Sequence, residues 1–170
     1  MSQEILFQSD SIAATRELGL LIGENLQPST VIGLTGTLGT GKTNLAQAIA
    51  EGLGVDPRNV VSPTYTICIP YSARLNVLHL DSYRIKHDEE VDELGLDERV
   101  ENGEVLIIEW IERIVEVAPP VDLQIDVEQM GESEREFNLK ALSEIGEQLL
   151  TSFSDKLTSN ETSSDHLAND

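Results

Sequence analysis

Residues 36–43 have the sequence Gly36-Thr37-Leu38-Gly39-Thr40-Gly41-Lys42-Thr43, which matches the phosphate-loop pattern G-x-x-x-x-G-K-[ST] at every position. Successive backbone N–H groups in such a loop point inward and wrap a phosphate chain, and the glycines permit the dihedral angles that this requires. We expect Lys42 to reach the β- and γ-phosphates and the hydroxyl of Thr43 to be a magnesium ligand. The stretch therefore predicts a nucleotide-binding site.

The sequence on both sides of the loop predicts the fold. Val31 to Leu34 is typical of a buried strand, and Lys42 to Leu53 of a helix whose positive N-terminal end favours anions. A second continuous apolar strand is expected at 105–108, and polar and apolar residues alternate at 123–127 and 137–139, as in a hairpin. Together they predict a three-layer α/β domain of the P-loop NTPase type, with a mixed, mostly parallel central sheet.

Further elements are expected along the rest of the chain. They are a helix from the capping residues 9–11 to about Leu26, β-rich segments at 65–71 and 77–80, a short acidic helix at 88–94 and a helix at 145–157. Residues 158–170 are rich in Ser, Thr, Asn and Asp and are expected to be disordered. The predicted organisation is a phosphate-loop domain at 1–150, followed at 151–170 by a helix end and a polar tail.

Composition excludes several classes of function. The chain has 170 residues with 31 acidic and 11 basic side chains, a formal net charge of −20. This balance argues against nucleic acid as the main direct ligand and against anionic membranes. The single cysteine, Cys68, excludes an internal disulfide. We find no apolar run near the roughly 20 residues that span a bilayer and no signal segment, so we expect a soluble, cytoplasmic protein.

Magnesium needs a second protein ligand, commonly an acid at the end of a neighbouring strand. Two acids qualify, because Glu109 follows the apolar residues 105–108 and Asp81 follows residues 77–80. Both strands could lie beside the loop-bearing strand. One acid would then coordinate the metal while the other positions water, and the sequence alone does not assign the two roles.

Three other features allow both a functional and a structural interpretation. Ser62-Pro63-Thr64 is either a switch loop that senses the γ-phosphate or a simple proline turn. His79 alternates with leucines, which favours a packed strand histidine, and Trp110 is either a core residue or a lid over the site.

The choice of nucleotide and of reaction rests on what the sequence lacks. The guanine-binding pattern [NT]-K-x-D has no match, which favours ATP. A small-molecule kinase would use the same loop with an arginine-bearing lid, but only Arg99 and Arg113 are basic between Gly95 and Pro120. Residues 86–136 contain many more acids than bases. This segment is either a surface that docks onto a basic protein or an acidic face that keeps the protein in solution.

Several motifs in the same order resemble one family. They are the loop in the form G-x-L-G-x-G-K-T, Ser62-Pro63-Thr64-Tyr65-Thr66, His79-Leu80-Asp81-Ser82-Tyr83-Arg84, Leu94-Gly95-Leu96-Asp97 and Glu109-Trp110. Over about Ser9 to Leu142, the chain resembles the TsaE (YjeE) family, the bacterial ATPase of tRNA threonylcarbamoyladenosine biosynthesis. It departs from that family's frequent residues at Thr37, Thr40 and Ile111.

The resemblance implies an ATPase that uses ATP and Mg²⁺ and works with TsaB- and TsaD-like proteins, which modify N6 of adenosine 37 in tRNA. The ATPase would be a nucleotide-driven helper that resets the partners, is weakly active alone and meets tRNA only through the complex. The implied site roles are phosphate binding for Lys42, magnesium binding for Thr43 and Glu109, a switch for Thr64, a site acid at Asp81, and base or ribose contacts for Ser11 and Glu132. The alternatives are a small-molecule kinase and a nucleotide-dependent binding module.

Overall fold

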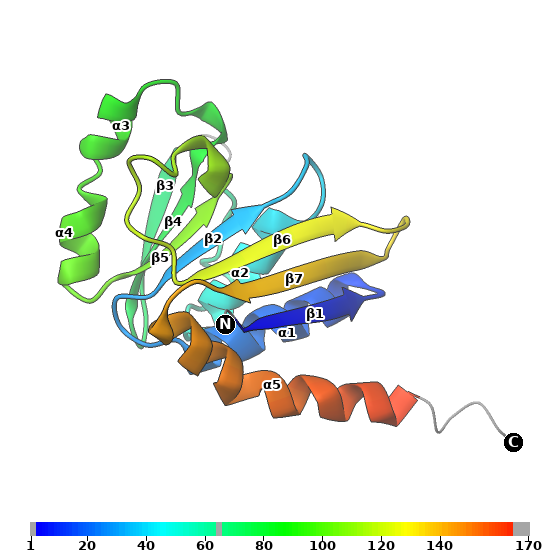
Figure 1. Cartoon of the computed structure of the whole chain (residues 1–170). Helices are drawn as coiled ribbons and strands as arrows, with labels where there is room; N and C mark the ends of the chain where they lie inside the picture. The colour runs from blue at the N-terminus through cyan, green and yellow to red at the C-terminus, as the bar shows by residue number, and fades with distance from the viewer. Residues whose placement is uncertain (1–2, 64–65, 165–170) are drawn as a thin grey trace, which may run out of the picture.

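The computed structural model describes residues 3–63 and 66–164, which form a sheet with helices on both faces (Figure 1). The strands are β1 (Glu4–Ser9), β2 (Val31–Thr35), β3 (Cys68–Ser72), β4 (Asn76–Asp81), β5 (Val105–Glu109), β6 (Leu123–Gln129) and β7 (Arg135–Ala141). The α-helices are α1 (Ile12–Asn25), α2 (Lys42–Gly52), α3 (Asp88–Asp92), α4 (Leu96–Glu101) and α5 (Glu144–Ser164). Short 3-10 helices follow β4 and β5, η1 at Ser82–Arg84 and η2 at Ile111–Arg113.

The sheet is mixed, as the sequence predicts. Its order is β1-β7-β6-β2-β5-β4-β3, with β6, β2, β5 and β4 parallel to one another. Antiparallel pairing of β7 with both β6 and β1, and of β3 with β4, places antiparallel neighbours at both edges. Only β7 and β3 therefore run against the common direction of the described strands. The loop-bearing strand β2 lies at the centre.

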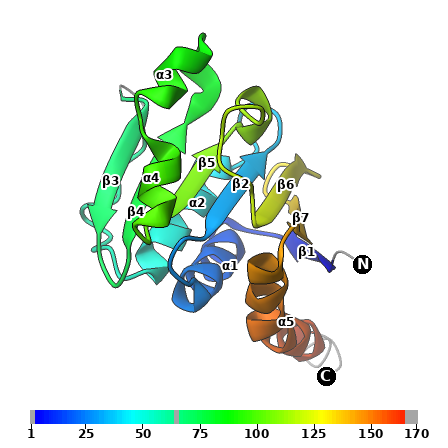
Figure 2. The same cartoon turned by 60° about the vertical axis from the view of Figure 1, so that its left-hand side comes forward.

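The three layers follow from the burial of alternate faces. One apolar cluster joins α1, α2 and α5 to the sheet, and a second joins α3, α4 and η2 to the opposite face (Figure 2). Every residue of β5 is buried, because a central parallel strand is covered on both faces and needs apolar side chains on each. Successive residues of β5 and β4 therefore face opposite layers.

Helices α1 and α2 cross at small residues, so their backbones come very close. A Cβ atom on Gly23 of α1 would lie 2.2 Å from the carbonyl oxygen of Ile49 and 2.7 Å from the Cα of Gly52, both in α2. One turn earlier, a Cβ on Gly19 would lie 2.4 Å from the Cβ of Ala48. Any larger side chain at these positions would force the helices apart.

Most expected elements are present, and the differences lie at the ends and edges. The strand β1 and the helix α4 were not expected, and β4 is separated from β2 by β5, so only one acid-ended strand neighbours the loop-bearing strand. The last helix was expected to end near Leu157 but continues to Ser164, so part of the predicted tail is helical. Within the described residues, no helix has the length and apolar character to cross a membrane.

Candidate functional site

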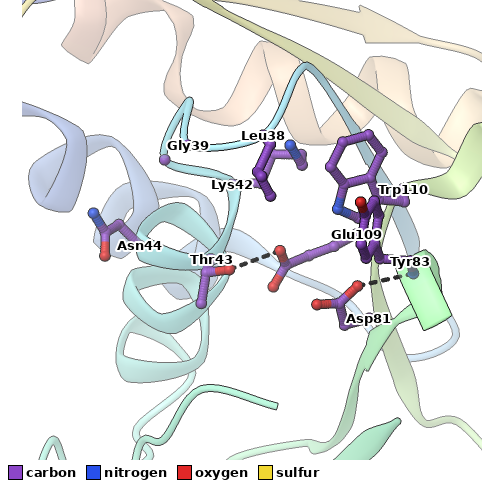
Figure 3. A pocket seen from close by; sticks show the side chains of 10 residues that line it. Leu38, Gly39, Lys42, Thr43, Asn44, Asp81, Tyr83, Glu109 and Trp110 are labelled. Atoms are coloured by element: carbon purple, nitrogen blue, oxygen red, sulfur yellow. Dashed lines mark hydrogen bonds between the residues drawn. The ribbon is translucent and has the colours of Figure 1, made fainter. Parts of the chain in front are cut away.

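The site lies where the carboxyl ends of the parallel strands meet, the usual position for ligands in such sheets. The phosphate loop leaves β2 and enters α2, while Glu109 ends β5 and Asp81 ends β4 opposite it in register. A pocket of about 290 Å³ opens there. It is lined by Leu38, Gly39, residues 41–44, Asp81, Tyr83, Glu109 and Trp110 (Figure 3).

The loop has the backbone that the glycines were expected to allow. Gly36, Gly39 and Gly41 have φ values of 138°, 80° and 102°, a region that side-chain-bearing residues rarely adopt. Thr40 closes the turn, since its hydroxyl donates to the carbonyl of Thr37 at 3.0 Å. The helix α2 starts immediately afterwards, and its first residues, which have free N–H groups, line the same pocket.

The Lys42 ammonium folds back over the loop. It donates hydrogen bonds to the carbonyls of Gly36 at 2.6 Å and Thr37 at 2.8 Å. It also lies 4.0 Å from the ring centroid of Trp110, a cation–π contact. Trp110 therefore covers the loop lysine, which agrees with the lid alternative rather than with a core position.

Opposite charges gather around this lysine. Burial lowers the pKa of Lys42 from its ordinary value, and the charges of Glu109, Glu112 and Asp81 oppose that shift. Burial raises the pKa of Asp81, while the backbone N–H of Tyr83, 3.0 Å from its carboxylate, lowers it. The pocket thus has an acidic side at the strand ends and a basic side at the loop.

The two residues predicted to bind magnesium touch each other. The Thr43 hydroxyl donates to Oε2 of Glu109 at 2.8 Å (Figure 3). The other carboxylate oxygen, Oε1, lies 2.6 Å from Nε2 of His79. Glu109 is 2% exposed and His79 is fully buried. Both oxygens of this carboxylate are therefore held by side chains from neighbouring elements.

A second pocket of about 180 Å³ lies beside the loop and contains Ser11, Thr40, Gly41 and Glu132. Ser11 is the N-cap of α1, where its hydroxyl accepts the N–H of Ala14 at 3.1 Å. Glu132 comes from the turn between β6 and β7. The structure thus brings both residues predicted to contact base or ribose next to the phosphate loop.

One predicted residue lies elsewhere, and another cannot be placed. Thr37 lines a separate cavity with residues of β6 and β7, although its carbonyl accepts a hydrogen bond from the Lys42 ammonium. Thr64 lies outside the described residues, so its switch role stays a prediction. Tyr83 and Asn44 were not predicted as site residues, yet both line its pocket. The position of Asn44 directly after Thr43 on the first turn of α2 could have indicated this.

The segment after β4 also holds the backbone of residues 109–110. Trp110 has a positive φ of 59°, which is uncommon for a residue with a large side chain. The buried hydroxyl of Ser82 lies 2.8 Å from the carbonyl oxygen of Glu109 and 2.6 Å from that of Trp110. The ring of Tyr83 packs on Trp110 at 5.0 Å between centroids.

Replacing Ser82 with Ala is expected to lower the free energy of unfolding by about 1–2 kcal/mol, because one buried and one partly buried carbonyl lose their shared donor. The left-handed backbone at Trp110 costs on the order of 1 kcal/mol and would relax once that donor is removed. Trp110 is the single tryptophan, so its emission reports the change directly. Ser72→Ala, at an exposed position of β3, is the control, and equal emission and stability in both variants would contradict the assignment.

Comparison with known proteins identifies the relatives of this site. The family model described as "Threonylcarbamoyl adenosine biosynthesis protein TsaE" matches residues 9–137, which include the loop, both strand-end acids and Glu132. The chain belongs to the TsaE family. Members of the TsaE family take part in tRNA threonylcarbamoyladenosine biosynthesis. The helix α5 lies beyond the part that the TsaE family model covers.

Individual TsaE relatives agree over most of the chain. The TsaE protein of Bacillus subtilis is 38% identical over 129 residues, covering 75% of this chain and 80% of its own. That of Treponema pallidum is 32% identical over 131 residues, covering 77% and 96%. The crystal structure of YdiB from Bacillus subtilis superposes with a TM-score of 0.75 and 28% identity over 95% of this chain and 98% of that one. The α/β P-loop fold is thus shared with a solved structure.

Proposed function

We propose that this protein is an ATPase of tRNA N6-threonylcarbamoyladenosine synthesis. It acts with TsaB- and TsaD-like partners as a nucleotide-driven helper rather than as the transferase, in the cytoplasm. The observation that carries the proposal is the pocket in which the phosphate loop faces Glu109 and Asp81. Membership of the TsaE family supplies the pathway.

The phosphate chain of ATP would lie in the curve of the loop. Backbone N–H groups of the loop and of the first turn of α2 would donate to its oxygens. Lys42 would leave the carbonyls of Gly36 and Thr37, which it now contacts, for phosphate oxygens, and it stays within reach because it already lies across the loop. Trp110 would keep water from this side of the site.

The site fits Mg²⁺ by the chemistry of its donors. Thr43 and Glu109 present a hydroxyl and a carboxylate oxygen 2.8 Å apart, and Mg²⁺ prefers oxygen ligands. Among the described residues, no group of three or more His, Cys, Asp or Glu side chains could hold a metal. That suits Mg²⁺, which usually takes one or two protein oxygens and completes its shell with phosphate and water. When bound, Mg²⁺ would neutralise charge on the phosphates.

Asp81 would be the site acid that orients the attacking water. It lies one strand further from the loop than Glu109, and its register pairing with Glu109 keeps the two carboxylates at the same edge. Glu109 is already bonded to Thr43 and is the better metal ligand. Ser11 and Glu132 would contact ribose or base in the smaller pocket.

Charge supports an indirect link to tRNA. With a net charge of −20, the protein would repel tRNA, so basic partners would hold the nucleic acid. The helices α3 and α4 carry acids in their first turns, at residues 88–90 and 97–98. This acidic face would dock on a basic partner surface, where charge complementarity speeds association.

The test is ATP turnover by the wild type and by Lys42→Ala, each alone and with the organism's own TsaB- and TsaD-like proteins. We expect wild-type turnover to depend on the partners and Lys42→Ala to abolish it, while Lys156→Ala, at an exposed position of α5, behaves as wild type. Brisk turnover that ignores the partners would overturn the helper role, and phosphorylation of an added metabolite would then indicate a kinase. Asp81→Ala separates the remaining alternative, because a binding module would keep assembly and tRNA modification despite slow hydrolysis.

A further inference from the structure

His79 occupies a position where an apolar residue would ordinarily pack. It lies in the middle of β4, between Leu78 and Leu80, and is fully buried. Residues two apart on a strand share a face, so His79 points to the same layer as Asp81, toward α2. Its direct neighbours across the sheet are Ile107 on β5 and Ile69 on β3, and its ring reaches diagonally to the carboxylate at the end of β5.

The ring makes one strong contact and leaves one nitrogen without a partner. Nε2 lies 2.6 Å from Oε1 of Glu109, while the buried Nδ1 has no hydrogen-bond partner in the part of the chain that the structure describes. An ionised carboxylate only accepts hydrogen bonds, so with such a partner the contact requires a proton on Nε2. Burying an unsatisfied ring nitrogen costs stability, which an aliphatic residue at this position would avoid. What the histidine adds is its hydrogen bond to Glu109.

We propose that His79 is a positioning residue, which fixes the Glu109 carboxylate so that Oε2 faces the Thr43 hydroxyl, where Mg²⁺ would be bound. The inference rests on the proposed function and deepens it. A free glutamate side chain samples many rotamers, and ordering it during metal binding reduces affinity. With Oε1 held by the ring and the carboxylate almost fully buried, Glu109 is ordered in advance. Mutating a hydrogen-bond partner of a metal ligand typically lowers metal affinity by about 10–100-fold.

Two amide variants provide a matched test. Glutamine carries its amide nitrogen as many bonds from Cβ as Nε2 is in histidine, so His79→Gln keeps a donor within reach of Glu109. Asparagine is one bond shorter and places its nitrogen near the position of Nδ1, so His79→Asn loses the contact. Both variants bury one amide, and the difference between them therefore reports the hydrogen bond rather than the polarity of the site.

The measurement is a Mg²⁺ titration of the full chain with ATP, followed by the emission of Trp110, with ATP affinity in EDTA measured in parallel. We expect His79→Asn to weaken Mg²⁺ binding by about 10–100-fold. His79→Gln should stay within about threefold of the wild type, and ATP affinity without metal should be unchanged in both. Equal Mg²⁺ affinity in the two variants would overturn the positioning role while leaving the proposed function intact. A wild type that does not bind ATP, or does not respond to Mg²⁺, would overturn the proposed function as well.

A second measurement covers the case in which both variants unfold. Nitrogen-15 NMR of the wild-type imidazole assigns its proton to one ring nitrogen. We expect a proton on Nε2 of His79, protected from exchange, both in the free protein and with Mg²⁺ and ADP. The assignment would be overturned if Nε2 carries no proton, or if its proton exchanges freely with solvent in the presence of Mg²⁺ and ADP.

Discussion

Replacing Gly36 with Ala is expected to weaken ATP binding by more than about 100-fold, which corresponds to about 2.7 kcal/mol. The φ of Gly36 is 138°, outside the left-handed helical region that other residues occasionally enter. A Cβ there would also lie 2.4 Å from the carbonyl oxygen of Val127 in β6 and 3.0 Å from the Thr40 hydroxyl. Neither the backbone angle nor β6 can yield without moving the loop, so its N–H groups would no longer converge.

Gly39→Ala is the matched control for Gly36. Its φ of 80° is also positive, but a Cβ at Gly39 would meet nothing within 4 Å. The cost is then conformational alone, about 1–2 kcal/mol, or roughly tenfold in affinity. Calorimetry of ATP binding measures the difference, and circular dichroism checks that both variants remain folded. Equal losses in the two variants would show that contact with β6 does not shape the loop.

Gly23→Ala is expected to lower the free energy of unfolding by about 3 kcal/mol, at the upper end of what overpacking costs. Two effects oppose each other, because alanine in a helix gains about 1 kcal/mol over glycine. The steric effect dominates, since the new methyl group would lie 2.2 Å from the carbonyl oxygen of Ile49 and 2.7 Å from the Cα of Gly52. Backbone atoms cannot rotate away as a side chain can, so α1 and α2 must separate.

Gly131→Ala in the β6–β7 turn supplies the control, because its Cβ would meet chiefly the flexible side chain of Glu134. That variant should stay within about 0.5 kcal/mol of the wild type. Urea unfolding of both variants gives the comparison. A Gly23→Ala protein as stable as the wild type would mean that the helices can part at little cost. Because α2 begins at Lys42, a shifted α2 should also weaken ATP binding.

Local signals predicted the centre of the molecule well. The loop, the strand before it, the helix after it and the β6–β7 hairpin depend on periodicity, glycines and capping residues that lie close together in the sequence. The helix start at Ser11 is an example, since its hydroxyl caps α1 as expected. These elements also supply the phosphate loop and the smaller pocket beside it.

Strand order could not be predicted in the same way. The strands β4 and β5 have the same local pattern, an apolar run that ends in an acid, so the sequence left both as neighbours of β2. In the structure β5 lies between β2 and β4. Glu109 is therefore the acid that touches Thr43, and Asp81 lies one strand away. The contact between His79 and Glu109 was missed for the same reason, because it depends on pairing between strands.

The edges of the fold depend on partners that are distant in the sequence. The strand β1 takes its place in the sheet through its pairing with β7. At the other end, composition predicted a polar tail from residue 158, whereas α5 continues to Ser164. Composition describes how much apolar surface a segment can bury. A helix that continues past its packed part needs little buried apolar surface there, so a polar composition does not exclude it.

The pairing of β1 with β7 also affects how the chain folds while it is synthesised on the ribosome. Glu4 pairs with Lys140, so the first strand emerges long before its partner exists. At about 5–20 residues per second, the interval is on the order of ten seconds. Throughout that time the newborn chain carries its phosphate loop beside an incomplete sheet. Until it pairs with β7, β1 leaves the apolar residues Ile5, Leu6 and Phe7, which Glu4 and Gln8 flank, without their place in the sheet.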